Sequence, residues 1–428
     1  MMVSSKRIVG GALLGLVFTV TSAVGDVKPG DVINRQNAAQ IKDLVTPSIE
    51  WVLSRGATIE IAEYKQVGWP KLYKEATEKY SGQVKLSGDG MTLEGHVAGM
   101  PFPAIDPNDP KAALKVMWNY EYRPYPGTDD FVEYDFPSMS MDIAGQGGAT
   151  VDRVFQIGDS RRLYYNARVA VDPKPELPNP KGYRFQDLIG PLLAPYDIKG
   201  LGALTYRHVN PTQQDNTFLY MPSLRRIRRL STAQRSSALF GQDADPDSFW
   251  GYSGHIAWMD WKFLGEKEML GVLHAEKVPM PQCPAPADFM FCDKWEKRKV
   301  YAIEGISKLP QYAYSKRVIF LDKESYIVTY SDIYDTRGEL WKVWIDHYVM
   351  SKQLKPGAPQ YDEERAFYTG FVMIDMQLNH ATFSPHPGKE TASDGWFFNA
   401  GAQSATAGTP EGSVPDAFTI AKLVARGQ

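Results

Sequence analysis

The sequence predicts a mainly β protein of the α+β class, built on a large antiparallel sheet in a single domain. Three observations support this prediction. After Gln83 the apolar residues follow the period of two that is typical of strands. Aromatic residues make up 12% of the 428 residues, and they suit long strands better than helical bundles. Successive period-two segments lie close together in the sequence, as they do in antiparallel hairpins.

The first residues have the pattern of a secretory signal. A basic pair, Lys6 and Arg7, precedes an apolar run, and a small-x-small cleavage site ends at Gly25. We therefore expect residues 1–25 to be a signal peptide, and residues 26–428 to form one domain with an N-terminal helical segment and a flexible C-terminal region. No cysteine lies near the cleavage site, so we expect an exported chain that is not itself lipidated.

The charge balance argues against nucleic acid as a partner. The formal net charge is -3, and the predicted signal carries two basic residues and no acidic one, so its removal gives -3 - 2 = -5. No later stretch approaches the roughly eighteen apolar residues of a membrane-spanning helix. We expect the mature chain to be soluble.

Helical spacing is confined to short segments. Gly56 is placed to end one helix, and Pro70 is placed to start another. Between these two helices, residues 57–64 are a predicted strand. Helices are predicted where apolar residues recur three and four positions apart: residues 37–45, 47–54, 69–80, 185–193 and 417–426.

Period-two segments follow in the middle of the chain. Residues 114–122 place Val116, Trp118 and Tyr120 on one strongly apolar face. A turn at residues 158–160 is predicted to make a hairpin of its two flanking strands. The predicted strands of this part are residues 114–122, 151–157, 163–171, 201–209 and 216–222.

The second half predicts a meander of longer strands. The turns DKES and DTRGE separate three of them, and Gly338 can take the positive φ that the second turn requires. The strands are predicted over residues 312–321, 326–334, 340–350 and 367–378. The polar, glycine-rich residues 379–395 and 400–413 are predicted loops.

The two cysteines, Cys283 and Cys292, lie close together in a Pro-rich segment. In an exported chain this spacing favours one disulfide that closes a small loop. Zinc binding is the alternative, but two thiols without a nearby histidine make a poor zinc site.

Motifs for catalysis and metal binding fail at decisive positions. A calcium loop starting at Asp243 would have Ser248 in place of its glycine and Gly254 in place of its bidentate glutamate. Residues 251–255 resemble a nucleophile elbow, but the second glycine is displaced, and the strand-to-helix pattern that such an elbow needs is absent. The seven histidines are scattered. We therefore expect no enzyme activity, no cofactor and no metal.

The stretch from Thr217 to Gly254 carries the main resemblance to a known family. An alternating strand stops at Pro222, a basic segment surrounds Ile227, and a Ser-rich link leads to Phe-Gly, acidic residues and aromatic-Gly. With WVLSRGATIEIAEYK and WPKLYKEATEKYSGQVKL near the N-terminus, this order resembles a periplasmic domain-of-unknown-function family of outer-membrane lipoprotein-sorting-like proteins, relatives of the LolA, LolB and RseB carriers. The resemblance covers nearly all of the mature chain.

That resemblance implies a LolA/LolB-like fold, in which a large curved antiparallel sheet forms an open half-barrel with helices covering its concave face. It implies a periplasmic carrier or binding protein for a hydrophobic small molecule or lipid, such as lipoprotein acyl chains, that acts between membranes in outer-membrane biogenesis. An inner-membrane transporter or an outer-membrane protein would be its partner. The alternative is a regulatory or assembly protein that uses the same fold to bind a protein, as RseB-like proteins do.

Two sets of residues are candidates for contacts with ligands. Period two sends the apolar residues of each predicted strand to one side, where they would bind the guest. This apolar set is Val116, Trp118, Tyr120, Phe155, Tyr165 and Phe218. The basic set is Arg225, Arg226, Arg228 and Arg229. These arginines would contact an anion or a partner protein. The alternative is a solvent-facing strand whose charges prevent pairing with the edge of another sheet.

Overall fold

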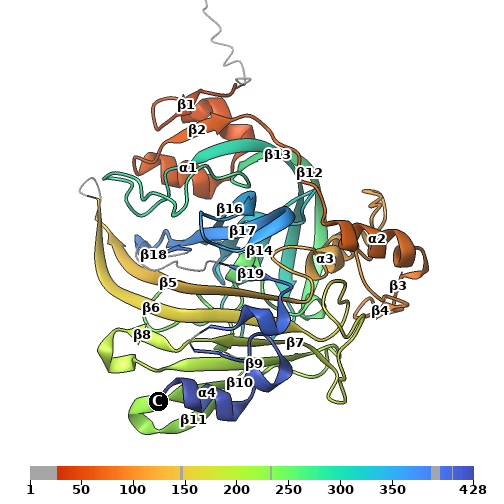
Figure 1. The fold of residues 1–428 in the computed structure, drawn as a ribbon. Coiled ribbons are helices and arrows are strands. Elements are labelled where there is room, and N and C mark those ends of the chain that lie inside the picture. Colours follow the sequence, from red (N-terminus) through yellow and green to blue (C-terminus); the bar gives the residue numbers. More distant parts are fainter. Residues whose placement is uncertain (1–26, 145–147, 232–233, 387–395, 407) are drawn as a thin grey trace, which may run out of the picture.

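A computed structural model of the protein describes residues 27–144, 148–231, 234–386, 396–406 and 408–428. The predicted signal peptide and its cleavage site lie outside the described residues. Within them, one large sheet contains most of the strands, and β5 and β6 curve around the centre of the molecule (Figure 1).

The large sheet has seventeen strands among the described residues. The strands from the first half of the chain are β1 (Val32–Ile33), β2 (Ile59–Ala62), β5 (Asp130–Ile143), β6 (Ala149–Tyr164), β7 (Tyr183–Ile189), β8 (Leu192–Ala194), β9 (Gly202–His208), β10 (Asn216–Met221) and β11 (Arg226–Leu230). The others are β12 (Met259–Gly271), β13 (Lys294–Ser307), β14 (Lys316–Asp322), β15 (Val328–Tyr334), β16 (Leu340–Gln353), β17 (Gln360–Asp375), β18 (His380–Pro385) and β19 (Phe397–Phe398).

The sheet is open. Strands β12 to β18 pair in sequence order, β18 then pairs with β5, and the series continues through β6, β7, β9, β10 and β11. These pairings are antiparallel, whereas β2 joins β13 in parallel, which makes the sheet mixed. Within the described residues, β11 pairs only with β10 and β12 only with β13, so the two ends do not close a barrel.

Few helices accompany the sheet. The α-helices are α1 (Pro47–Ser54), α2 (Lys71–Tyr80), α3 (Ala112–Glu121) and α4 (Ile420–Arg426); the 3-10 segment η1 (Ala38–Leu44) precedes α1, and β3 (Lys85–Leu86) pairs with β4 (Leu93–Glu94). In Figure 1, α1 lies above β16 and β17, α2 and α3 lie at one side, and α4 lies beside β9 and β10. No helix in the described ranges combines the length and apolar character needed to cross a membrane.

The predicted fold class is confirmed: the chain is mostly β, with a large sheet that does not close and few helices. The helices α1 and α2 and the meander β14 to β17 lie where the sequence predicts them. The disulfide between Cys283 and Cys292 is present, and the sulfur of Cys283 belongs to the core beneath α1.

The predicted strand over residues 114–122 is wrong, because this segment is helix α3. Its apolar residues are compatible with both periods, and α3 is buried on almost every side, including the side that carries Ala113 and Met117. A helix that is apolar all round gives no contrast between a polar and an apolar face, so an alternating pattern within it is misleading.

Three further predictions are wrong for related reasons. The expected turn at residues 158–160 does not exist, because β6 runs unbroken from Ala149 to Tyr164. The helix expected around residues 185–193 is the strands β7 and β8, and part of the loop expected after residue 379 is β18, which joins β17 to β5. Each of these segments is stabilised by pairing on both sides: β6 with β5 and β7, β7 with β6 and β9, and β18 with β17 and β5.

Candidate functional site

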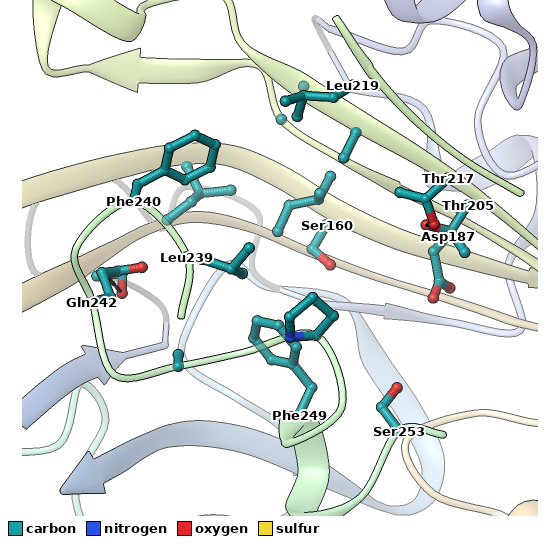
Figure 2. Close-up of a pocket in the computed structure, with 18 of the residues that line it drawn as sticks. Ser160, Asp187, Thr205, Thr217, Leu219, Leu239, Phe240, Gln242, Phe249 and Ser253 are labelled. Carbon is teal, nitrogen blue, oxygen red and sulfur yellow. Dashed lines mark hydrogen bonds between the residues drawn. The ribbon is translucent and has the colours of Figure 1, made fainter. Parts of the chain in front are cut away.

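A cavity of about 450 Å³ lies between the concave side of strands β5 to β11 and the segment that follows them. We call residues 234–255 the covering loop, because they lie across these strands and line the opposite wall (Figure 2). Tyr368 and Phe371 of β17 contribute a third wall. The volume falls within the range of about 300–1,000 Å³ that is usual for small-molecule sites.

Strand pairing sets the chemistry of the cavity row by row. Phe136 of β5 lies opposite Ile157 of β6, and Ser138 lies opposite Phe155. Leu192 of β8 pairs with Ile157 and extends the same apolar surface. The side chains of this wall form a cluster that is buried although it borders open space, namely Phe136, Phe155, Ile157, Leu192 and Leu201.

The other end of the cavity is polar. Asp187 of β7 lies opposite Thr205 of β9, which lies opposite Thr217 of β10, and Figure 2 shows the three side chains together. Arg162 donates to both oxygens of Asp187, from Nε at 2.6 Å and Nη2 at 2.7 Å, while the two threonine hydroxyls lie 3.0 Å apart. The Asp187 side chain is 31% exposed, so it retains capacity to accept hydrogen bonds from a guest.

One end of the covering loop is held by a buried ion-pair network. Arg235 donates to Asp215, Asp247 and the Ser253 carbonyl, and Arg207 also donates to Asp215. Burial alone would raise the pKa of Asp215, but the guanidinium groups of Arg207 and Arg235 outweigh it and lower that pKa to about 2. Asp215 is therefore ionised at neutral pH and fixes Arg235.

The middle of the loop is held by polar contacts to β5 and β18. Gln242 donates to the Ser138 hydroxyl at 2.5 Å, and the Asp243 amide donates to the Thr382 hydroxyl at 2.6 Å. The Asp243 carboxylate lies 2.7 Å from His380 Nδ1. The loop is thus attached at both ends of the cavity, and Leu239 and Phe240 extend between the attachments (Figure 2).

A second histidine contributes to the cavity wall. His386 Nδ1 lies 2.6 Å from Glu133 Oε2, its Nε2 lies 2.9 Å from the Ser384 hydroxyl, and its ring stacks on Phe136. Serine, histidine and carboxylate in line resemble a catalytic triad. However, the Ser384 hydroxyl donates its one hydrogen to the Pro137 carbonyl at 2.7 Å, so it accepts from His386 and is not poised as a nucleophile.

In the part of the chain that the structure describes, Asp142, Asp152 and His380 bring possible metal-ligand atoms within 4.8 Å of one another. Both carboxylates are exposed. The hydrogen bond that His380 donates to the Asp243 carboxylate raises the pKa of His380, which favours the protonated imidazole. Since a protonated imidazole cannot ligate a metal, this arrangement fits an ion pair better than a metal site.

The six predicted apolar contacts occupy different parts of the molecule. Phe155 lines the cavity. Tyr165 packs on Tyr183, and Phe218 packs on Tyr206 in the cluster beside α4. The three on α3 are buried in a separate core and are absent from the cavity lining: Val116, Trp118 and Tyr120.

Tyr120 nevertheless touches the covering loop from behind, because its hydroxyl donates to the Trp250 and Tyr252 carbonyls. The basic set lies on and beside β11, where the four side chains are exposed.

Sequence reasoning missed most of the cavity wall. Phe131 and Glu133 are two residues apart on β5, as are Phe136 and Ser138, but Asp135, with a positive φ of 62°, lies between the two pairs and breaks the period of two that sequence reasoning relies on. The polar row of Asp187, Thr205 and Thr217 had no local signal, because strands β7, β9 and β10 bring it together only by pairing.

Comparison with known proteins gives a family match over most of the chain. The family described as "Protein of unknown function (DUF1329)" matches residues 32–423. The uncharacterized protein PA3922 of Pseudomonas aeruginosa is 25% identical over 365 residues, which are 82% of this chain and 74% of that protein.

Solved structures give more distant similarities. An outer membrane lipoprotein-sorting protein domain from Vibrio parahaemolyticus has a TM-score of 0.47 and 18% identity, over 73% of this chain and 98% of that one. A DUF1329 family protein from Desulfovibrio piger has a TM-score of 0.40 and 15% identity, over 60% and 83%. The LolA superfamily protein NE2245 from Nitrosomonas europaea has a TM-score of 0.36 and 13% identity, over 64% and 90%.

Proposed function

The chain belongs to the DUF1329 family, and we propose that it is an exported, periplasmic binding or carrier protein that holds one apolar molecule in the cavity under the covering loop. The cavity carries this proposal, since an apolar space of about 450 Å³ is bordered by phenylalanine, leucine and isoleucine side chains. Apolar surface leaves water with a gain of about 25 cal/mol per Å², so a guest with several hundred Å² of such surface would be held strongly.

The covering loop supports reversible binding. Its largely exposed part, residues 237–241, lies between attachments at Arg235 and at Gln242 and Asp243, and these are side-chain ion pairs and hydrogen bonds and not strand pairing. Such a segment can open without disturbing the sheet, because the ladders of β5 to β11 do not include it. A carrier needs this property to release its cargo to a membrane or to a membrane protein.

The first experiment extracts purified protein with organic solvent and identifies apolar compounds by mass spectrometry. We expect a lipid or a similar apolar molecule in about equal amount to the protein. The same protein, stripped of lipid, should bind an uncharged fluorescent apolar dye. If no compound is extracted and no dye binds, the carrier function is wrong, and the alternative of a partner-binding regulatory protein takes its place.

A matched pair of substitutions locates the binding. Ala203 lines the cavity between Ile189 and Leu219, whereas Val154 on β6 is 42% exposed on the outside. Ala203→Phe should fill the cavity and weaken dye binding at least about tenfold, which is 1.4 kcal/mol. Val154→Phe adds a ring outside the cavity and should leave dye binding unchanged. Equal effects of both would contradict this location.

Location is tested by intact-mass analysis of protein from the periplasmic fraction. We expect a chain that starts at Asp26 and carries no acyl group. A mass that includes residues 1–25, or an added lipid, would contradict the proposed export route.

A further inference from the structure

Strand β11 brings two arginines to the rim of the cavity. It pairs with β10 in a register that places Leu230 opposite Thr217 and Arg228 opposite Leu219. Thr217, Leu219 and Leu230 all line the cavity. Because residues two apart on a strand share a face, Arg226 and Arg228 lie on the same side of the sheet as Leu230.

The register also sets how far these arginines lie from the apolar lining. Directly opposed residues have Cβ atoms about 5 Å apart, so the side chain of Arg228 starts beside that of Leu219. Arg226 follows about 7 Å further along the strand, opposite Met221. Both side chains are exposed. The face of β11 therefore runs from apolar lining at Leu230 to guanidinium groups at the rim.

These arginines have no acidic counterpart in the surrounding sequence. No aspartate or glutamate occurs from Asn216 to Gly241. Among the described residues, no ion pair joins Arg226 or Arg228 to a carboxylate. The arginines that line the cavity each have an aspartate partner: Arg207 and Arg235 bind Asp215, and Arg161 binds Asp159 through Nη2 while its Nε and Nη1 are buried without a hydrogen-bond partner among the described residues.

The polar end within the cavity has the opposite character. Asp187 presents a carboxylate there, and an ion moved from water into an apolar space without a partner costs several kcal/mol. An anionic group on a guest is thus disfavoured beside Asp187 and favoured at the rim. Guanidinium groups bind phosphate and carboxylate oxygens in pairs of parallel hydrogen bonds.

We infer that the molecule held in the cavity is an anionic amphiphile, whose apolar chain lies among the cavity residues and whose phosphate or carboxylate head meets Arg226 and Arg228 at the rim. This inference rests on the proposed carrier function. The inference defines the class of ligand by an apolar chain at one end and an anionic head group at the other.

The test compares ligands that share a chain and differ in the head. Dodecyl phosphate, dodecanoate and dodecanol compete with the uncharged dye for lipid-stripped protein, each below the concentration at which it forms micelles. Inorganic phosphate is the control that has the anionic head group but no apolar chain. We expect dodecyl phosphate and dodecanoate to bind about tenfold more tightly than dodecanol. Inorganic phosphate alone should not displace the dye and should not bind measurably in calorimetry.

The neighbouring arginine supplies the control. Arg229 lies opposite Phe218 on the other face of the hairpin and donates to Asn216. Arg228→Gln should weaken binding of the two anionic ligands about tenfold and leave dodecanol unchanged. Arg229→Gln removes the same charge from the same strand and should change neither.

The outcomes separate the inference from the carrier function. If dodecanol and the anionic ligands bind equally, or if both substitutions act alike, the arginines at the rim do not distinguish anionic from uncharged head groups. The inference is then wrong, while the carrier function stands. If inorganic phosphate binds as tightly as dodecyl phosphate, β11 forms a simple anion site and the inference is also wrong. If none of the chains displaces a dye that binds, the inference is wrong while the carrier function stands. If the dye does not bind either, the carrier function fails, and the inference fails with it.

Discussion

The cavity under the covering loop and the core around α3 are both rich in aromatic residues, but only the first encloses space. In the α3 core, side chains leave the helix in all directions, and Trp118, Tyr120 and Met117 meet β12 to β14 on one side and the loop on the other. In the cavity, the cover is an irregular loop, and its segment between the attachments at Arg235 and Gln242 carries small residues such as Ser237 and Ala238.

This difference teaches that aromatic content alone does not indicate a binding site. The nature of the covering element decides whether the space is filled, because a helix packs side chains at every turn whereas a loop held at separate points leaves a gap. The two regions are in contact, because the hydroxyl of Tyr120 in the α3 core donates to the carbonyl of Trp250 in the covering loop.

The largest effect is expected in the α3 core. Trp118 is 4% exposed, and its Nε1 donates to the Gly90 carbonyl at 3.2 Å. Trp118→Ala should lower the free energy of unfolding by about 4 kcal/mol, because truncation leaves a hole in a packed core. Chemical denaturation measures this change, with the exposed Val154→Ala as control. A loss below about 1 kcal/mol would show that this region is loosely packed like the cavity.

The next effect is expected at the loop attachment. Arg235→Met leaves Asp247 buried without its partner, and removing one member of a buried pair costs about 3 kcal/mol. Hydrogen exchange in residues 234–255 should increase more than exchange in β5 and β6. Arg228→Met on exposed β11 is the matched control and should change neither quantity. Uniform exchange changes across the sheet would contradict a separately held loop.

A smaller, pH-dependent effect is expected at Asp346. Burial raises its pKa to about 8, although hydrogen bonds from Tyr368 and Trp344 oppose this shift. The folded state therefore keeps a proton that the unfolded state loses near pH 4, so stability falls as the pH rises from about 4 to about 8. Asp346→Asn does not titrate and should remove a decline of just under ~3 kcal/mol between pH 5 and pH 7, since each pH unit in this window changes the stability by about 1.4 kcal/mol. Denaturation at several pH values measures it, and an unchanged slope in the variant would contradict this assignment.

The smallest stability effect is expected in the cavity wall. Leu219 borders open space on one side, so Leu219→Ala should cost about 1 kcal/mol, less than a Leu→Ala change in a filled core. Dye binding should weaken in the same variant. A loss as large as that of Trp118→Ala would mean that the cavity wall is packed like the α3 core.

Local patterns identified those elements whose signals are local. Helix α2 begins after Pro70, and the hairpin of β15 and β16 turns at Gly338, so each was readable from a few neighbouring residues. Strand β7 was not, because its residues pair with β6 and β9 and its sequence carries prolines on both sides. Of the candidate contacts, Phe155 was identified because it lies in a period-two segment, two positions before Ile157, and both residues line the cavity.

The sequence by itself determined that the chain is mostly β, that its cysteines form one disulfide, and that the stretch from Thr217 to Gly254 holds arginines close to aromatic and acidic residues. Only the tertiary structure decided which aromatic face borders a cavity and which is packed solid. Periodicity states which residues share a side of one element, but the element that covers this side comes from a distant part of the chain. Here one apolar face is a helix surrounded by neighbours, and the other lies under a loop that two ion pairs of Arg235 hold in place.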